Sequence, residues 1–274
     1  MTHPFAANIL CVGLIRNGAD IIEKEILNLS HSFSFAKKLH FFIVESDSND
    51  QTILTLEELS NTVKNFEYVS LGNLSDLNLK RTERISICRN RYLDEIFSNK
   101  KYEDIDYVVM ADLDGVNSCL NKNSVLSCWN RSDWDVCYAN QKGAYYDIWA
   151  LRHELWSPND CWKQYDFLIS QGVNREYSLL FSVVSRMILI PTDAPWISVN
   201  SAFGGLGLFK KKILKKLIFT GNNENGEEVC EWVEFNKSIA KRGGRIYINP
   251  SLINSNFNEH TLNYSNILNS IRLK

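Results

Sequence analysis

Short apolar runs alternate with helix-patterned segments in the first part of this chain, and this alternation constrains its fold more than any other feature. The apolar runs cover residues 8–14, 39–44, 66–70 and 106–111, and the helical patterns cover residues 20–29, 52–65 and 84–97. Strands that alternate with helices form a mainly parallel sheet with helices on both faces. We therefore expect an α/β fold.

The rest of the chain is less regular but is expected to continue the same domain. Residues 134–139 predict a strand, and residues 228–241 predict a helix that ends at Gly243-Gly244. Residues 245–248 predict a last strand, which ends before Pro250. No internal repeat or low-complexity linker divides the chain, so we expect a single domain over residues 1–274.

The composition is that of a globular protein with little charge preference. The net charge of -2 disfavours nucleic acid as a partner. The seven cysteines include no CxxC pair, which is typical of reduced thiols in a reducing compartment. The chain opens without a secretion signal and holds no apolar run of about 18 residues that could cross a membrane. We expect a cytoplasmic protein.

Polar residues follow three of the predicted strands. They are Arg16 and Asn17 after the first strand, Glu45 and Asp47 after the second, and Asp112-Leu113-Asp114 after residues 106–111. Parallel sheets bind ligands beyond the carboxyl ends of their strands, so these side chains should gather at one edge. Two carboxylates one residue apart suit Mg²⁺ or Mn²⁺. A solvated turn at Asp112, and helix capping by Glu45 or Asp47, are the alternatives.

The helix expected at residues 84–97 carries side chains suited to a nucleotide. Arg84 and Arg89 can each bind phosphate oxygens through paired N–H groups, and Asn90 can bind a base edge or a ribose. The alternative is an ordinary surface helix with positive charges.

In their order along the chain these motifs resemble the glycosyltransferases of the GT-A fold. The resemblance rests on residues 14–17, the acidic residues after residue 44, Cys88-Arg89-Asn90, the Asp-x-Asp motif at residues 112–114, the glycine-rich residues 202–207 and the acidic residues 230–235. It implies one Rossmann-like domain, with a nucleotide-binding half at residues 8–115, an acceptor-binding half at residues 116–250 and a tail at residues 251–274.

The resemblance also assigns site residues. It implies nucleotide-sugar binding by Arg16, Asn17, Glu45, Asp47, Arg84, Arg89, Asn90, Asp112, Gly204 and Gly205. It implies a metal held by Asp112 and Asp114, with His260 as a further candidate ligand. A spacing that would support His260 is absent from the sequence around it, so an ordinary surface histidine is the alternative.

A narrower resemblance is to bacterial capsule and lipopolysaccharide transferases related to fungal capsule α-mannosyltransferases. Residues 145–152, 203–207 and 245–250 carry it. Many inverting members of the fold begin the late acidic helix with Glu-Asp, and the Asp deprotonates the acceptor. Trp232 stands at that position here, which leaves Glu231 as the candidate base or indicates a retaining enzyme. Asp147 lies in an aromatic run and is expected to hold a sugar hydroxyl.

The implied function is a metal-dependent glycosyltransferase of surface polysaccharide synthesis, such as that of capsule or O-antigen. It would use Mn²⁺ or Mg²⁺, a nucleotide-sugar donor (a UDP-sugar first, a GDP-sugar next) and a glycan or lipid-linked glycan acceptor. A non-catalytic carbohydrate- or nucleotide-binding module and a nucleotidyltransferase are the alternatives. The Asp112/Asp114 pair argues against the first, and the poor match of residues 14–18 to a phosphate loop argues against the second.

Residues 209–219 alternate lysine clusters with apolar residues and predict an amphipathic helix. The lysines are Lys210, Lys211, Lys212, Lys215 and Lys216. Such a helix can rest on anionic lipid at the inner face of the membrane, with each lysine contributing about 1 kcal/mol. The alternative is a helix that packs its apolar side on the sheet while its lysines face water.

Overall fold

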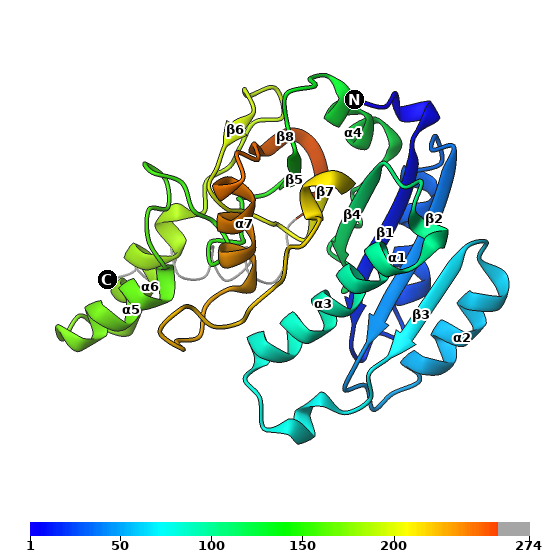
Figure 1. Cartoon of the computed structure of the whole chain (residues 1–274). Coiled ribbons are helices and arrows are strands. Elements are labelled where there is room, and N and C mark those ends of the chain that lie inside the picture. The colour runs from blue at the N-terminus through cyan, green and yellow to red at the C-terminus, as the bar shows by residue number, and fades with distance from the viewer. Residues whose placement is uncertain (257–274) are drawn as a thin grey trace.

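One sheet of eight strands runs through the computed structural model, which describes residues 1–256 (Figure 1). The strands are β1 (Asn8–Ile15), β2 (Lys38–Glu45), β3 (Phe66–Ser70), β4 (Tyr107–Asp112), β5 (Val136–Gln141), β6 (Ile197–Ser198), β7 (Leu206–Lys210) and β8 (Ile246–Ser255). Their order across the sheet is β3-β2-β1-β4-β7-β5-β8-β6. β1 to β4 are parallel to one another, and β5 is parallel to β8, whereas β6 and β7 run antiparallel to their neighbours. The mainly parallel α/β sheet predicted from the sequence is confirmed.

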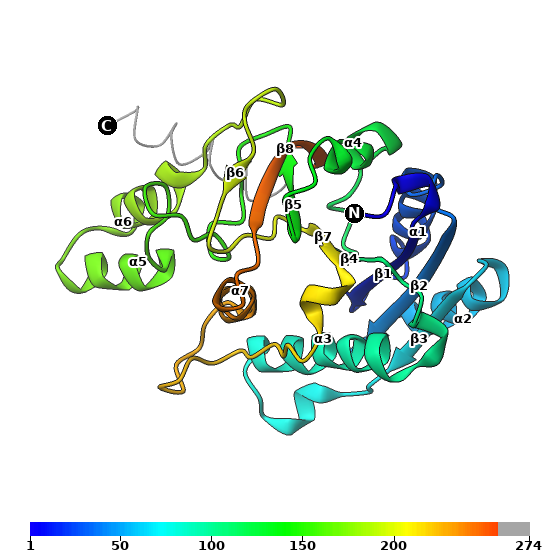
Figure 2. The same cartoon turned by 45° about the horizontal axis from the view of Figure 1, so that its top comes forward.

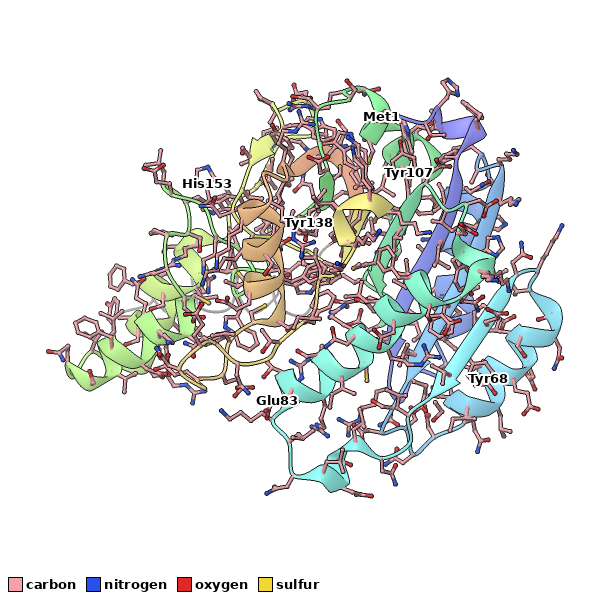
Figure 3. The ribbon with its side chains drawn as sticks, viewed as in Figure 1. Met1, Tyr68, Glu83, Tyr107, Tyr138 and His153 are labelled. Carbon is pink, nitrogen blue, oxygen red and sulfur yellow. The ribbon has the colours of Figure 1, made fainter. Side chains whose placement is uncertain are left out.

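Helices cover both faces of this sheet. They are α1 (Ile22–Ser32), α2 (Thr52–Thr62), α3 (Arg81–Ser98), α4 (Lys122–Leu126), α5 (Cys161–Ser170), α6 (Arg175–Ser182) and α7 (Glu231–Lys241). Buried residues of α3 and α7 share one hydrophobic core with one side of the sheet, and buried residues of α1, α2 and α4 share a second core with the other side. Tyr138 on β5 belongs to the first core and Tyr107 on β4 to the second (Figure 3).

The sequence of β1 explains why it lies in the middle of the sheet. Leu10 and Val12 face the core under α3, while Ile9 and Cys11 face the core under α1. Because successive side chains of a strand point to opposite faces, a continuous apolar run such as this one is buried on both sides.

The antiparallel strand β7 joins the two parts of the chain. It lies between β4 and β5, with Met110 of β4 opposite Gly207. Just before β7, the carbonyl oxygen of Gly205 accepts a hydrogen bond of 2.9 Å from the Asp112 N–H. The glycine-rich residues are thereby fixed beside the carboxyl end of β4.

The helices α5 and α6 form a hairpin that projects from the sheet (Figures 1 and 2). The Asp160 carboxylate caps α5 by accepting hydrogen bonds of 2.9 and 3.1 Å from the N–H groups of Trp162 and Lys163. Arg186 is buried where the hairpin meets the body and donates hydrogen bonds to Ser157 Oγ and the Asn159 carbonyl at 3.0 and 3.1 Å.

The last strand is longer than predicted, since β8 continues through Pro250 to Ser255. Its pairing with β5 shifts between the Tyr138–Ile248 pair and the Asn140–Ile253 pair. In this bulge Pro250 needs no N–H for the ladder, and its carbonyl oxygen accepts a 3.0 Å hydrogen bond from Asn140 Nδ2. The prediction that the strand ends before Pro250 is therefore wrong.

The prediction of an amphipathic helix at residues 209–219 is also wrong. Phe209 lies in β7 and is buried, and only one turn of 3₁₀ helix follows, at Lys211–Leu214. Lys210 Nζ lies 3.6 Å from Asp135 Oδ1, and Lys211 Nζ donates to the Glu103 carbonyl at 3.0 Å. Pairing with β4 and β5 overrides the local helical pattern here. Within residues 1–256, none of the helices combines the length and the apolar character needed to cross a bilayer.

Candidate active site

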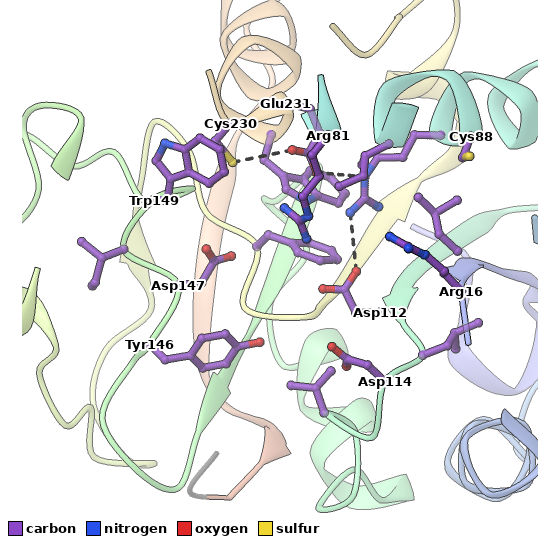
Figure 4. A pocket seen from close by; sticks show the side chains of 18 of the residues that line it. Arg16, Arg81, Cys88, Asp112, Asp114, Tyr146, Asp147, Trp149, Cys230 and Glu231 are labelled. Carbon is purple, nitrogen blue, oxygen red and sulfur yellow. Dashed lines mark hydrogen bonds and ion pairs between the residues drawn. The ribbon is translucent and has the colours of Figure 1, made fainter. Parts of the chain in front are cut away.

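A cavity of about 1110 Å³ opens at the carboxyl ends of β1, β2 and β4 (Figure 4). Its charged lining residues are Arg16, Asp47, Arg81, Arg84, Arg89, Asp112, Asp114, Asp147 and Glu231. They come from strand ends, from the N-terminal half of α3, from the loop after β5 and from the start of α7. The parallel topology thus collects these polar groups at one edge, as the sequence predicted.

Asp112 and Asp114 both face this cavity. Asp112 is the last residue of β4, and its carbonyl oxygen accepts a 2.6 Å hydrogen bond from Asn117 Nδ2. Asp114 is exposed and makes no hydrogen bond or salt bridge with any other described residue. Burial raises the pKa of Asp112 to about 7 against the opposing charge of Arg89, and the neighbouring carboxylates add to this rise.

These two carboxylates fit a divalent cation that takes its remaining ligands from a substrate. Residues 1–256 contain no cluster of three or more His, Cys, Asp or Glu side chains that would hold a metal by themselves. Two hard oxygen donors beside a wide cavity are typical of Mg²⁺ or Mn²⁺ sites completed by phosphate oxygens. His260, the third predicted ligand, lies outside the described residues.

The raised pKa of Asp112 predicts that binding of Mn²⁺ depends on pH. A proton and a cation compete for the same carboxylate, so affinity falls as the pH drops through about 7. Between pH 8 and pH 6 we expect the apparent affinity for Mn²⁺ to fall about tenfold. Calorimetric titration of metal-free protein at the two pH values measures this change, and equal affinities would contradict it.

Arg89 lines the cavity, and its guanidinium is paired with carboxylates of the protein. Its Nε lies 3.1 Å from Glu231 Oε1, and its Nη2 lies 3.5 Å from Asp112 Oδ1. The guanidinium also lies 4.4 Å from the ring centroid of Trp232. The side chains of Arg89 and Glu231 are only 5% and 7% exposed, so this ion pair is buried.

Arg16 and Arg81 are the free cations of this site. In Figure 4 both side chains point toward the space around Asp112. Neither guanidinium makes a hydrogen bond or salt bridge with another residue of the described chain. Arg84 differs, because its Nη1 lies 3.3 Å from Asp47 Oδ2. Arg81, the first residue of α3, was not predicted, because the sequence pattern placed the start of this helix at residue 84.

The pKa of Asp47 is held below its usual range. Burial works against this shift, but the carboxylate accepts a 2.7 Å hydrogen bond from the Ser75 N–H and faces Arg84 and Arg16. Asp47 therefore stays ionised and neutralises part of the positive charge of the cavity wall.

Five predicted nucleotide-binding residues do not line the cavity, and three of them, Glu45, Asn17 and Asn90, have polar side chains that bind other parts of the chain. Glu45 is buried, and its carboxylate accepts hydrogen bonds from the Ser48 N–H and the Ser70 hydroxyl. Asn17 Oδ1 accepts a 2.8 Å hydrogen bond from the Asn49 N–H. Asn90 exchanges two hydrogen bonds with the backbone of Phe219, at 2.9 and 2.7 Å. These side chains hold loops in place, and their positions give no support to a contact with the nucleotide.

Gly204 and Gly205 do not line the cavity but pack against residues that do. Gly204 and Gly205 have φ values of +68° and +85°, which favour glycine. A Cβ at Gly205 would lie 2.7 Å from Val116 Cγ1 and 3.0 Å from Tyr146 Oη. The Gly204 N–H donates a 3.0 Å hydrogen bond to Asp147 Oδ2. The pair therefore packs closely against residues that line the cavity and fixes Asp147.

Glu231 and Asp147, the predicted catalytic residues, both reach the cavity. Glu231 is the first residue of α7, so its carboxylate lies at the positive end of the helix dipole, and it pairs with Arg89. Asp147 lies beside Trp149 and Tyr146, which also line the cavity.

Two solved structures have the same fold as this chain. One is the mannosyltransferase PcManGT from Pyrobaculum calidifontis in complex with GDP-Man and Mn²⁺, with a TM-score of 0.52 and 14% identity over 90% of this chain. The other is S. aureus TarS 1-349 in complex with UDP, with a TM-score of 0.51 and 14% identity over 97% of this chain. The chain spans 56% of the first structure and 66% of the second. No protein-family model and no curated protein sequence matches the chain.

The first of these neighbours is a mannosyltransferase, and this chain shares the fold of both, so the α/β fold implied by the sequence motifs is confirmed. The narrower resemblance to capsule transferases is not supported by these neighbours and stays a prediction.

Proposed function

We propose that this chain is a glycosyltransferase that moves a sugar from a nucleotide-sugar to a glycan acceptor in surface polysaccharide synthesis. The observation that carries the proposal is one cavity in which two strand-end carboxylates, Asp112 and Asp114, face two unpaired arginines, Arg16 and Arg81. A diphosphate carries the charge that this combination would bind, because arginines pair with phosphate oxygens and carboxylates hold a cation between them and the phosphates.

In this proposal each group of the wall has one task. Asp112 and Asp114 hold Mn²⁺ or Mg²⁺, which when bound neutralises the charge of the departing diphosphate. Arg16 and Arg81 bind phosphate oxygens and orient the donor. Glu231 is the carboxylate that would accept the acceptor proton in an inverting reaction, and Asp147 would hold a sugar hydroxyl at the opposite wall.

The fold neighbours include a complex with GDP-Man and one with UDP, so they leave the choice of nucleotide open. We propose a UDP-sugar first and a GDP-sugar next. Incubation with a panel of nucleotide-sugars and Mn²⁺, followed by mass spectrometry, tests the proposal. Release of a nucleoside diphosphate supports it, release of pyrophosphate indicates a nucleotidyltransferase, and binding without turnover indicates a non-catalytic module.

Arg81→Met is expected to weaken binding of Mn²⁺-UDP or Mn²⁺-GDP by about tenfold or more, because loss of a hydrogen bond to a charged group costs about 1.5–3 kcal/mol. The melting temperature should stay near that of the wild type, since the Arg81 guanidinium has no hydrogen bond or salt bridge within residues 1–256. Calorimetry measures the affinity. Arg175→Met, which changes an exposed arginine on α6, is the control. An unchanged affinity for Arg81→Met would remove it from the nucleotide site.

A further inference from the structure

The part of the cavity that faces the hairpin differs in chemistry from the part around Asp112. Between residues 148 and 187 its lining includes Ile148, Trp149, Leu179, Val183, Val184 and Met187, and no charged residue. The charged lining residues all lie outside this stretch of the chain. The cavity therefore has a charged end at the strand termini and an apolar end at α5 and α6.

The apolar end is poorly suited to a sugar. Its lining side chains from residues 148–187 offer no carboxylate, amide, hydroxyl or guanidinium group, and their only polar atoms are the Cys161 thiol and the indole N–H groups of Trp149 and Trp162. The indole N–H of Trp149 already donates a 3.1 Å hydrogen bond to Asp160 Oδ2. A sugar buried there would leave hydroxyl groups without partners, whereas a hydrocarbon chain would lose no hydrogen bonds.

The apolar lining continues out of the cavity along α5. Trp162 lines the cavity and is 42% exposed, and its ring centroid lies 5.9 Å from that of Tyr165. Ile169, which is 41% exposed, follows one turn later on the same side of the helix. We call Trp162, Tyr165 and Ile169 the α5 track.

The hairpin and the segments on either side of it expose a large share of the apolar surface. Of the seventeen large hydrophobic residues that are exposed within residues 1–256, eight lie between Leu155 and Leu189. The buried contacts of Arg186 and the ion pair between Arg152 and Asp160, at 3.0 Å, fix the base of this segment. Because the segment is well anchored, its apolar exposure is a feature of the fold, and apolar patches of this kind mark interaction sites.

We propose that the apolar end of the cavity and the α5 track bind the hydrocarbon chain of an acceptor whose sugar is linked to a long alkyl or polyprenyl chain. The inference rests on the proposed function, because it places the acceptor sugar between this end and the charged donor end. The continuity of the track with the cavity favours a chain as the occupant. A second copy of the protein could cover the outer helix face but could not fill a cavity lined by Val184 and Met187.

The test measures the affinity of the wild-type protein for hexyl, octyl and decyl β-maltoside, each below its critical micelle concentration, by calorimetry. Burial of one methylene group improves affinity roughly fourfold, so we expect at least about a tenfold gain from hexyl to decyl. Trp162→Gln and Ile169→Glu should reduce this gain by about half or more. Ile53→Glu is the matched control, because Ile53 lies on α2 and is also 41% exposed.

Equal affinities for the three maltosides would overturn the proposal. It would also be overturned if Ile53→Glu reduced the gain in affinity from hexyl to decyl maltoside as much as Trp162→Gln and Ile169→Glu do. A wild-type dimer that Ile169→Glu dissociates in analytical ultracentrifugation, while Ile53→Glu does not, would also overturn it in favour of a second copy. Binding of Mn²⁺-UDP and donor hydrolysis are measured on the same wild-type protein. A missing chain-length effect with intact nucleotide turnover rejects the hydrocarbon site alone, and the reverse result rejects the proposed function alone.

Discussion

Asp114→Asn is expected to lower the rate of sugar transfer by at least about a hundredfold while the melting temperature stays near that of the wild type. The Asp114 carboxylate is exposed and has no hydrogen bond or salt bridge within residues 1–256, so folding does not depend on its charge. The charge of Asp114 is needed to bind the divalent cation beside the diphosphate. Removal of one of the two anionic ligands lowers the affinity of the site for this cation. Release of nucleoside diphosphate in the presence of Mn²⁺ measures the rate.

The control for this variant is Asp193→Asn, which changes another exposed aspartate away from the cavity. Chelation should abolish the activity of the wild-type protein, and addition of Mn²⁺ or Mg²⁺ should restore it. Full activity of metal-free protein in excess chelator would rule out the proposed role of both aspartates.

Arg89→Met should destabilise the protein by about 3–5 kcal/mol, since it leaves the buried carboxylate of Glu231 without its partner. For a domain of this size the melting temperature should fall by on the order of 10 °C. The variant also removes the contact of the guanidinium with the Trp232 ring. Thermal unfolding followed by circular dichroism measures the change.

Arg91→Met is the matched control, because Arg91 lies on the same helix and forms an i,i+4 salt bridge with Glu95. The Arg91 side chain is 33% exposed, so this ion pair is not buried. Such a pair contributes about 1 kcal/mol or less. Adding Glu231→Gln to Arg89→Met should restore part of the lost stability, because the unpaired charge is removed. If Arg89→Met melts with the wild type and only loses nucleotide affinity, Arg89 belongs to the nucleotide site instead.

The aspartates of the site could be predicted from the sequence because their position depends on local information. A buried run ends at Ala111, and the two carboxylates follow within three residues. Once the alternation of strands and helices indicates a parallel sheet, the carboxyl end of that strand is known to face the ligand edge. No long-range contact has to be known for this step.

The sequence does not distinguish the arginines that are free to bind a ligand from those that pair with a carboxylate of the protein. Arg81, Arg84 and Arg89 lie within one helix, but the first is free, the second pairs with Asp47 and the third pairs with Glu231. The partner of Arg89 is 142 residues away along the chain. Whether a guanidinium binds a ligand or an internal carboxylate depends on which segments pack against the helix, and the pattern within the helix does not contain this information.

Hydrophobic periodicity acts within each segment, so the alternation of elements, the parallel half of the sheet and the edge at which the aspartates lie could be predicted from the sequence. The tertiary structure alone decided that residues 206–210 form a strand between β4 and β5 and that α5 and α6 form an apolar hairpin beside the cavity. Strand pairing and burial depend on surfaces contributed by distant residues, and in residues 209–219 they outweighed a local preference for helix.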